Sequence, residues 1–215
     1  MRPAPAPHID WPSELAGGLA AMSLHLDADQ QERLVGYLEL LERWNKVFNL
    51  TAVRDRADMV RRHLLDSLSI LPWVVAGPVL DVGTGAGLPG IPLAIARPQL
   101  AFSLLDSNGK KTRFVRQVVA ELGLANVEVI NGRVEALARP RAFTRITSRA
   151  FATLADMLAG SDALLADGGR WLAMKGAAPL AELRELPNGI DAEVVELQVP
   201  GEPGRRHLVI MQRAG

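Results

Sequence analysis

The chain of 215 residues contains no cysteine. This absence excludes disulfide bonds, cysteine-based metal sites and catalytic thiols. The histidines do not have the spacing of metal ligands, so we predict no metal site; they are His8, His25, His63 and His207. No apolar run approaches the ~20 residues of a membrane span, and the start of the chain lacks the apolar core of a signal peptide. We therefore expect a cytoplasmic protein without a membrane partner.

The chain also has no net charge, because its 24 Lys and Arg residues balance its 24 Asp and Glu residues. No global positive field therefore indicates a nucleic-acid partner. The charges are unevenly distributed, however. Residues 77–150 contain ten cations and five acidic residues, a local charge of +5, whereas residues 1–76 and 151–215 have net charges of −2 and −3. An anionic polymer would meet a basic patch in the central segment.

The length, with 48% hydrophobic residues, suffices for one α/β domain and a small extension. We predict that residues 1–12 form a disordered, proline-rich tail. Residues 13–76 are predicted to be a helical extension that forms one compact unit with residues 77–215. Its first helix, capped by Asp27 or Asp29, runs to about residue 48, and its second covers residues 57–71.

From residue 79 onward the pattern alternates between strands and helices. The predicted strands are 79–83, 101–106, 127–131, 143–148, 170–175, 192–199 and 206–213, and the predicted helices are 88–96, 110–122 and 152–165. Such alternation is typical of a parallel sheet with helices on both faces. A loop rich in proline and glycine joins the last two strands, so we predict an antiparallel hairpin at the end of the sheet.

The most informative stretch is VLDVGTGAGLPG, residues 79–90. A short apolar strand containing Asp81 leads into closely spaced glycines, and Pro89 stands where a helix would begin. Residues 85–90 match GxGxxG, the dinucleotide-binding pattern. With Asp81 the run reads DxGxGxG, which resembles motif I of S-adenosylmethionine-dependent methyltransferases with a Rossmann-like fold. The next strand ends on Asp106, which can accept hydrogen bonds from both ribose hydroxyls of an adenosine.

Three functions are compatible with this loop: a methyltransferase, a dinucleotide-dependent oxidoreductase, and a non-enzymatic RNA-binding protein with a degenerate nucleotide fold. Asp81 and the predicted terminal hairpin argue against the oxidoreductase. The glycines and Asp106 are all present, which argues against a degenerate fold. A Walker loop is excluded, because GxxxxGK[ST] does not occur in the chain.

Cationic residues cluster directly after Asp106. Lys110, Arg113 and Arg116 are spaced i, i+3 and i+6, so they share one flank of a predicted helix, and Lys111 extends that flank. These four residues are candidates for contact with RNA phosphates. An ordinary solvated helix face would give the same pattern.

The residues after the predicted strand at 143–148 bear on the methyl acceptor. Methyltransferases acting on exocyclic amines of bases have [DNS]PP[YFW] at this point, and the chain lacks it. Methylation of pyrimidine C5 requires a covalent cysteine adduct, which this chain cannot form. What remains is an acceptor that is already nucleophilic. Guanine N7 fits, because it has an in-plane lone pair and no proton to remove, so that positioning and electrostatics suffice.

Further motifs make the resemblance specific. They are Trp44–Lys46, Asn49–Thr51, His63–Ser67, Asp81–Pro92, Leu105–Ser107, Arg133–Glu135, Ser148–Ala152, Met174–Gly176 and Arg206–Val209. In these motifs the chain is similar to the bacterial small-subunit ribosomal RNA guanine-N7 methyltransferases, a family once called glucose-inhibited division protein B. The resemblance covers nearly all of residues 30–213.

This resemblance implies a Rossmann-like α/β fold with a mostly parallel seven-stranded sheet, and S-adenosylmethionine as methyl donor. It further implies methyl transfer to N7 of a guanine in the 530 loop of 16S ribosomal RNA, by in-line displacement without a covalent intermediate. The implied partner is 16S ribosomal RNA or the small ribosomal subunit. We expect the protein to be a monomer.

The resemblance also implies the cofactor-binding residues. Gly83, Gly85 and Leu88 would line the methionine end, Asp106 the ribose, and Val134 and Glu135 the adenine, with Gly87 and Ser107 as further contacts. Without the family, an exposed loop acid is an equally good interpretation of Glu135. Arg149 would lie between cofactor and acceptor as the candidate catalytic residue, holding the cofactor carboxylate or an RNA phosphate. A structural salt bridge is the alternative for Arg149.

Two more groups are candidates for the site. His63, Asp66 and Ser67 fall within about one turn of the second predicted helix. The residues alone favour a role in bracing the junction with the sheet, whereas the resemblance to the family favours side chains that face the pocket. The candidates for RNA contact late in the chain, which are equally compatible with ordinary surface charge, are Lys175, Arg205, Arg206 and His207.

Overall fold

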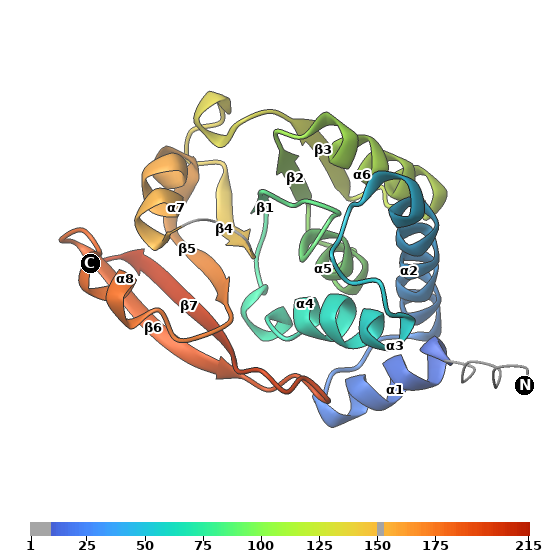
Figure 1. The fold of residues 1–215 in the computed structure, drawn as a ribbon. Coiled ribbons are helices and arrows are strands. Elements are labelled where there is room, and N and C mark those ends of the chain that lie inside the picture. Colours follow the sequence, from blue (N-terminus) through green and yellow to red (C-terminus); the bar gives the residue numbers. More distant parts are fainter. Residues whose placement is uncertain (1–9, 150–152) are drawn as a thin grey trace, which may run out of the picture.

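The computed structural model describes residues 10–149 and 153–215. A seven-stranded sheet lies between helices on its two faces (Figure 1). The strands are β1 (Val79–Val82), β2 (Phe102–Asp106), β3 (Val127–Asn131), β4 (Phe143–Ser148), β5 (Leu165–Lys175), β6 (Ile190–Leu197) and β7 (Arg206–Arg213). Their order across the sheet is β3-β2-β1-β4-β5-β7-β6.

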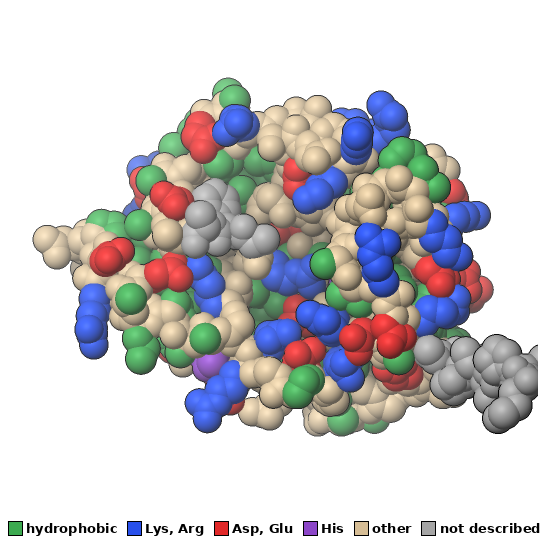
Figure 2. Space-filling model, viewed as in Figure 1, with side chains coloured by type: hydrophobic (Ala, Val, Ile, Leu, Met, Phe, Trp, Pro, Cys, Tyr) green, Lys and Arg blue, Asp and Glu red, His purple; other side chains and the backbone are tan. Residues whose placement is uncertain are grey.

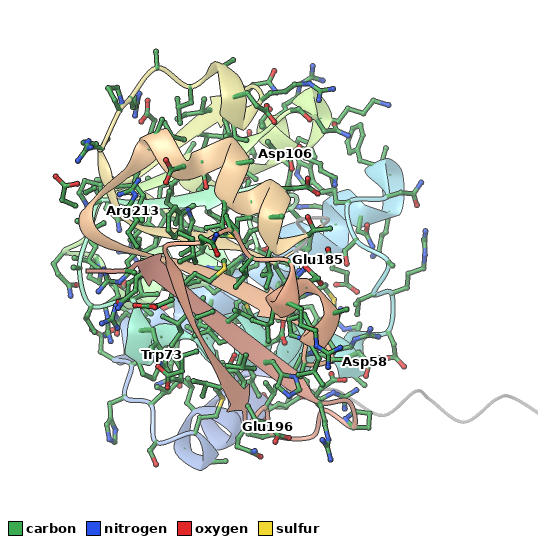
Figure 3. All side chains as sticks on the ribbon, turned by 90° about the vertical axis from the view of Figure 1, so that its left-hand side faces the viewer. Asp58, Trp73, Asp106, Glu185, Glu196 and Arg213 are labelled. Atoms are coloured by element: carbon green, nitrogen blue, oxygen red, sulfur yellow. The ribbon has the colours of Figure 1, made fainter. Side chains whose placement is uncertain are left out.

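Strands β1 to β5 are parallel, and β7 pairs antiparallel with both β5 and β6. The predicted fold class, with its terminal hairpin, is therefore confirmed. Figure 3 looks at the hairpin edge and shows β6 and β7 crossing in front of the other strands. Strand β5 begins earlier than the predicted residue 170, because Gly168 and Gly169 weaken the sequence signal of its first half.

The helices before the sheet are α1 (Trp11–Ala21), α2 (Ala28–Phe48), α3 (Arg56–Met59), the π-helix η1 (Val60–Leu65), α4 (Asp66–Leu68) and the 3₁₀ turn η2 (Leu71–Trp73). Those between strands are α5 (Gly90–Ala96), α6 (Gly109–Glu121), η3 (Val134–Ala136), α7 (Leu154–Ser161), η4 (Asp162–Leu164) and α8 (Leu180–Arg184). The single helix predicted over residues 57–71 is thus a succession of three pieces. None of the described helices is long and apolar enough to span a bilayer.

Alternating side chains of the strands divide the hydrophobic core into two parts. Leu172 and Met174 of β5 belong to the part that contains residues of α1, α2, α5 and α6. Trp171 and Ala173 of the same strand belong to the part that contains residues of α7. The N-terminal helices therefore share one continuous core with the first face of the sheet.

Helix α1 corrects the predicted disordered tail. The helix begins at Trp11 with Asp10 as N-cap, so residues 10–12 are helical or cap the helix, while residues 1–9 of the predicted tail lie outside the described part. Trp11 is buried, and its Nε1 donates a hydrogen bond to the carbonyl oxygen of Arg56 at 2.9 Å. Pro12 is compatible with this helix, because proline is tolerated in the first turn.

Helix α2 connects the N-terminal part to the glycine loop. Its cap is Asp27 rather than Asp29: Asp27 accepts a hydrogen bond from the backbone N–H of Gln30, whose side chain accepts one from the N–H of Asp27. Halfway along, the buried hydroxyl of Tyr37 donates to the carbonyl oxygen of Ala86 at 2.9 Å. The extension therefore directly supports the loop that follows β1.

Gly17 and Gly18 of α1 provide a matched test of its packing. A Cβ at Gly18 would lie 2.3 Å from Cδ1 of Leu65 in η1, whereas one at Gly17 would have no atom within 4 Å. We expect Gly18→Ala to lower the free energy of unfolding by about 1–3 kcal/mol through overpacking. Gly17→Ala should leave it unchanged or raise it by up to ~1 kcal/mol. Urea unfolding measures both, and equal effects would contradict the packing of α1 on η1.

Candidate functional site

A buried carboxylate under the glycine loop organises the site. Asp81 of β1 has no exposed surface. Its Oδ2 accepts hydrogen bonds from Oγ1 of Thr84 at 2.5 Å and from the backbone N–H of Gly90 at 3.0 Å, and its Oδ1 accepts one from Oγ1 of Thr147 in β4 at 3.3 Å. One side chain therefore fixes the start of the loop, the start of α5 and the neighbouring strand.

The glycines of the loop are required by its shape. Gly83, Gly85 and Gly87 have φ angles of +67°, +61° and +93°, a region that side chains disfavour. At Gly90 a Cβ would lie 2.2 Å from Cδ2 of Leu104 and 2.7 Å from Oδ2 of Asp81. A side chain at any of these positions would change the loop or push α5 away from the sheet.

A first cavity of about 600 Å³ lies at the carboxyl ends of β1 and β2 and the loop after β3. The predicted cofactor residues that line it are Gly83, Asp106, Ser107, Val134 and Glu135. They come from three separate loops, and the parallel sheet brings them together because the carboxyl ends of its strands lie at one edge. This is where ligands bind in open α/β sheets.

Asp106 connects this cavity to the glycine loop. Its Oδ2 accepts a hydrogen bond from the N–H of Gly85 at 2.8 Å, and its Oδ1 accepts one from the N–H of Asn108 at 2.7 Å. Each carboxylate oxygen retains a further lone pair. Asp106 can therefore accept hydrogen bonds from a ligand while it keeps the loop in place.

The remaining predicted cofactor residues lie elsewhere. Gly85, Gly87, Leu88 and Arg149 do not line the first cavity. Gly85 donates a hydrogen bond to Asp106, which does line the first cavity. Leu88 is buried in the hydrophobic core. Arg149 lines a second cavity.

Sequence reasoning missed Asp156 in the first cavity and gave Arg133 no role there, although both line it. Arg133 lies two residues after the end of β3 and belongs to the motif Arg133–Glu135, so its position could have been inferred. Asp156 lies in the first turn of α7, which packs against η3. No local pattern indicates that packing.

The second cavity, of about 350 Å³, is lined by η1 and α4, the ends of β4 and β5, and the start of β7. Among its lining residues are Arg149, Lys175 and His207 together with His63 and Asp66. The structure places His63 and Asp66 at the second cavity and not at the first, and Asp66 also joins α4 to the start of β7, as in the bracing alternative. Ser67 is fully buried outside the lining of both cavities.

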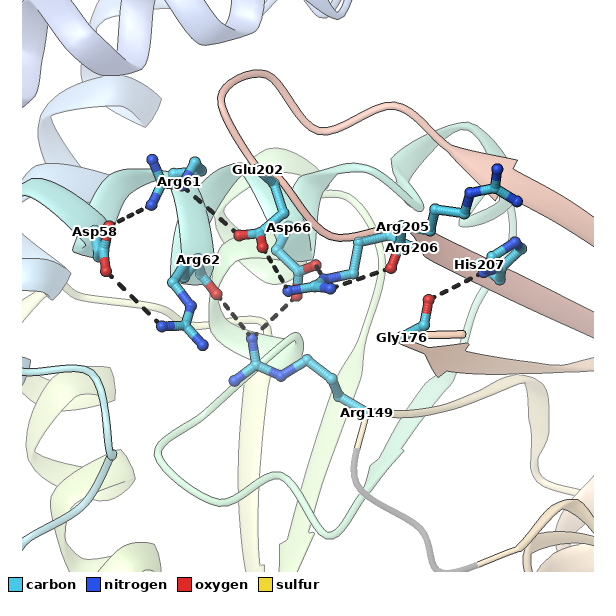
Figure 4. A network of polar contacts seen from close by, with 10 residues as sticks. All are labelled: Asp58, Arg61, Arg62, Asp66, Arg149, Gly176, Glu202, Arg205, Arg206 and His207. Carbon is cyan, nitrogen blue, oxygen red and sulfur yellow. Dashed lines mark hydrogen bonds and ion pairs between the residues drawn. The ribbon is translucent and has the colours of Figure 1, made fainter. Parts of the chain in front are cut away.

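Most cations of the second cavity are paired with carboxylates (Figure 4). Asp66 accepts hydrogen bonds from Nη1 of Arg149 at 3.3 Å and from Nε of Arg206 at 3.1 Å. Nζ of Lys175 lies 3.0 Å from a carboxylate oxygen of Glu182. The salt bridge that was the alternative role of Arg149 is therefore present. A ligand would have to bind Arg149 through N–H groups that this salt bridge does not use.

His63 is a neutral group of this cavity. Burial, and secondarily the positive charge of Arg149, lowers the pKa of His63 to about 3. Its Nε2 lies 3.2 Å from Oγ1 of Thr51, and its Nδ1 has no hydrogen-bond partner among the described residues. At neutral pH His63 therefore adds no charge to the second cavity.

The other predicted RNA-binding residues are on the surface. Lys110, Arg113 and Arg116 are exposed on α6, Lys111 is partly buried, and Arg205 is exposed before β7. Figure 2 shows Lys and Arg side chains around a hollow near the centre of the face seen in Figure 1. The predicted residues therefore form two groups, one on α6 and one where β5 and β7 border the second cavity.

Comparison with known proteins identifies the family. The family model described as "GidB: rRNA small subunit methyltransferase G" matches residues 30–209. The chain belongs to this family. The resemblance inferred from the motifs is thereby confirmed.

Several curated members of the rRNA small subunit methyltransferase G family are similar over almost the whole chain. The protein of Marinobacter nauticus is 56% identical over 205 residues, covering 95% of this chain and 96% of the relative. That of Xanthomonas campestris pv. campestris strain 8004 is 52% identical over 205 residues, with the same coverage. That of Laribacter hongkongensis is 51% identical over 197 residues, covering 91% and 95%. Each is named ribosomal RNA small subunit methyltransferase G.

Solved structures show the fold of this rRNA small subunit methyltransferase G family member. A SAM-dependent methyltransferase from Aquifex aeolicus matches with a TM-score of 0.56 at 20% identity, covering 73% of this chain and 94% of that one. TrmN from Thermus thermophilus matches with a TM-score of 0.55 at 22% identity, covering 68% and 48%. At such identities the likeness shows the fold alone, which is that of the S-adenosylmethionine-dependent methyltransferases.

The buried carboxylate predicts a specific pH dependence. Burial raises the pKa of Asp81 from 3.8 to about 6. Between these values the folded protein keeps a proton that the unfolded chain has released. The contribution of Asp81 to the free energy of unfolding is therefore fully present below pH 3.8 and is lost as the pH rises to about 6.

Asp81→Asn keeps an acceptor oxygen without the charge. We expect the free energy of unfolding of the unsubstituted protein, minus that of the variant, to fall by about 2 kcal/mol between pH 4 and pH 7. Urea unfolding of both proteins across this range measures the difference. A difference that is independent of pH would contradict the burial of an ionising group at this position.

Proposed function

We propose that the chain transfers a methyl group from S-adenosylmethionine to N7 of a guanine in the 530 loop of 16S ribosomal RNA, with S-adenosylhomocysteine as the second product. The observation that carries this proposal is one cavity formed by the glycine loop and Asp106, in a chain 56% identical to a ribosomal RNA small subunit methyltransferase G. The family membership also argues against the nicotinamide-dependent reaction that GxGxxG alone would allow.

The first cavity fits the proposed cofactor. A Cβ at Gly83 would meet no atom within 4 Å, so the main chain there faces open space that a ligand can fill. Asp106 can accept hydrogen bonds from the ribose hydroxyls, and Val134 and Glu135 offer apolar and polar contact to the adenine. When bound, the cofactor supplies a methyl group on a positively charged sulfur.

The acceptor chemistry requires positioning rather than a base. Guanine N7 carries no proton, and its lone pair can attack in line without a covalent enzyme intermediate. Arg149 is the proposed catalytic residue, because it directly follows β4, the strand next to β1 and its glycine loop, and lines the second cavity.

The proposed partner is 16S ribosomal RNA, free or within the small subunit, bound by a cytoplasmic monomer. The exposed cations of α6 follow Asp106 after a short turn, so RNA bound along them lies next to the first cavity. Lys175, Arg205 and His207 would contact the same RNA from the hairpin side.

Mapping of the methylated atom tests the proposal. The protein is incubated with labelled S-adenosylmethionine and either 16S ribosomal RNA or small subunits, and the RNA is then treated with borohydride and aniline, which cleave at 7-methylguanine. We expect one cleavage site, in the 530 loop, and no label in a reaction with Asp106→Ala. Labelled RNA without cleavage would exclude N7 as the acceptor.

The basic flank of α6 predicts a change in salt dependence. Each phosphate contact adds about 1 to the slope of log affinity against log salt concentration. Replacing Lys110 and Arg113 by Ala should therefore reduce the slope of RNA binding by about 2 and leave cofactor affinity unchanged. Filter binding at several salt concentrations measures the slope.

A control for this experiment removes the same charge elsewhere. Arg141 is exposed just before β4, and Arg170 is exposed in the middle of β5, level with the start of β1 and so away from the carboxyl ends of the strands. Replacing both by Ala should leave the slope unchanged. Equal reductions in both double variants would show that overall charge, and not the α6 flank, determines RNA binding.

A further inference from the structure

Helix α2 ends in an aromatic side chain to which the proposed function gives no role. Phe48, the last residue of the helix, is 42% exposed, whereas the other aromatic side chains of the described part of the chain are buried or half-buried. Val47 next to it is 70% exposed. A single exposed ring is common on protein surfaces, so its meaning depends on what holds it and what surrounds it.

The polar residues around Phe48 fix the turn that presents it. Asn49, the C-cap of α2, has a left-handed backbone with a φ angle of 50°. Its Oδ1 accepts a hydrogen bond from Nη2 of Arg54 at 2.6 Å. Oδ1 of the buried Asn45 accepts a hydrogen bond from the backbone N–H of Thr51 at 2.9 Å. The two sequence motifs that flank the ring therefore hold it at the surface in a defined turn.

A row of aromatic rings supports Phe48 from the interior. The centroid of its ring lies 5.2 Å from that of Trp44, which in turn lies 5.6 Å from that of Phe114 in α6. The ring of Phe114 lies 6.4 Å from that of Tyr37, whose hydroxyl donates to the glycine loop. Phe48 is thus the outer end of a packed row that begins at the glycine loop. A ring held in this way loses little conformational freedom when a second flat group stacks on it.

The surroundings of this ring are basic. Lys46 and Arg54 are exposed on the turn itself, and the first turns of α6 add Lys110 and Arg113. In the described part of the chain, none of these four cations takes part in an ion pair. Figure 2 shows hydrophobic side chains exposed where the upper end of α2 meets α6, with Lys and Arg side chains around them. Unpaired cations beside an exposed ring are the features with which proteins bind single-stranded nucleic acid.

The start of α6 connects this surface to the first cavity. Helix α6 begins three residues after Asp106, and Nζ of Lys111 lies 3.9 Å from the position of a Cβ added at Gly85. From Gly109 to Phe114 the helix rises by about 8 Å. An RNA strand that follows α6 away from the first cavity therefore reaches the aromatic row within two turns of helix.

We propose, on the basis of the function proposed above, that Phe48 stacks on an unpaired base of the bound ribosomal RNA and that Lys46 contacts a phosphate next to this base. Stacking on aromatic side chains is how proteins hold unpaired bases of RNA. The bases of a duplex are already stacked on one another, so the end of α2 would select RNA in which a base is free. An apolar side chain of a protein partner is the other possible occupant, and it would not require a flat ring at position 48.

Three substitutions of Phe48 separate stacking from apolar contact. Phe48→Ala removes the ring, Phe48→Leu keeps apolar surface without a flat face, and Phe48→Tyr keeps the flat face. Filter binding measures the affinity of each variant, saturated with S-adenosylhomocysteine, for 16S ribosomal RNA. Val47→Ala is the matched control, because this side chain is exposed on the same turn but is aliphatic.

Stacking predicts a distinct pattern among these variants. We expect Phe48→Ala and Phe48→Leu to weaken RNA binding about ten-fold, and Phe48→Tyr and Val47→Ala to stay within about two-fold of the unsubstituted protein. Phe48→Ala should leave the slope of log affinity against log salt concentration unchanged, whereas Lys46→Ala should reduce it by about 1. Full affinity in Phe48→Leu would overturn stacking in favour of apolar contact. Full affinity in Phe48→Ala would exclude RNA as the partner of this ring.

A model strand shows which part of the RNA meets the ring. Binding of octaadenylate is compared with binding of the same octamer built from abasic nucleotides, which keeps the phosphates and lacks the bases. We expect Phe48→Ala to weaken binding of octaadenylate and to leave binding of the abasic strand unchanged. Equal weakening for both strands would overturn the proposal.

Two controls keep these results interpretable. An unchanged circular dichroism spectrum and an unchanged affinity for S-adenosylhomocysteine show that a variant is folded, and Phe48→Leu provides the test if Phe48→Ala does not fold. No methyl transfer is involved in these measurements. RNA that binds through Phe48 but is not methylated at N7 would therefore refute the proposed acceptor atom and leave the stacking contact intact.

Discussion

Asp81 lies without solvent contact beneath the glycine loop, and donors from the loop, from α5 and from β4 converge on its two oxygens. Burying a carboxylate is unfavourable, as its raised pKa shows, and the three donors offset only part of that penalty. Because all three donors must reach the same carboxylate, the glycine loop, α5 and β4 can meet in only one arrangement. The first cavity, the position of Asp106 and the N–H groups facing it all depend on that arrangement.

The sequence was sufficient to predict the sheet because its signals are local. Alternating apolar residues, the glycines after β1 and the acid at the end of β2 each lie within a short window. The predicted strands, apart from the start of β5, the terminal hairpin and the position of Asp106 at the end of β2 follow from these windows. Since parallel strands end at one edge, the prediction that separate loops share a cavity needed only the topology.

What could not be predicted depends on contacts between distant segments. Helix α1 was missed because Pro12 and two glycines hide its pattern, while the burial of Trp11 depends on α3. Asp66 and Arg206 are 140 residues apart, and no motif shows that they meet. That Arg149 and Arg206 share Asp66 as a partner is likewise visible only from their hydrogen bonds.

The contact between β7 and α4 has a consequence for the order in which the protein is completed during synthesis. All residues that line the first cavity precede residue 161, whereas the second cavity needs Lys175 and Arg206. A chain that leaves the ribosome from its amino end therefore has every group of the first cavity before it has those of the second. The last strand to emerge supplies Arg206 to the network around Asp66, so the second cavity is completed only after every residue of the first cavity has been synthesised.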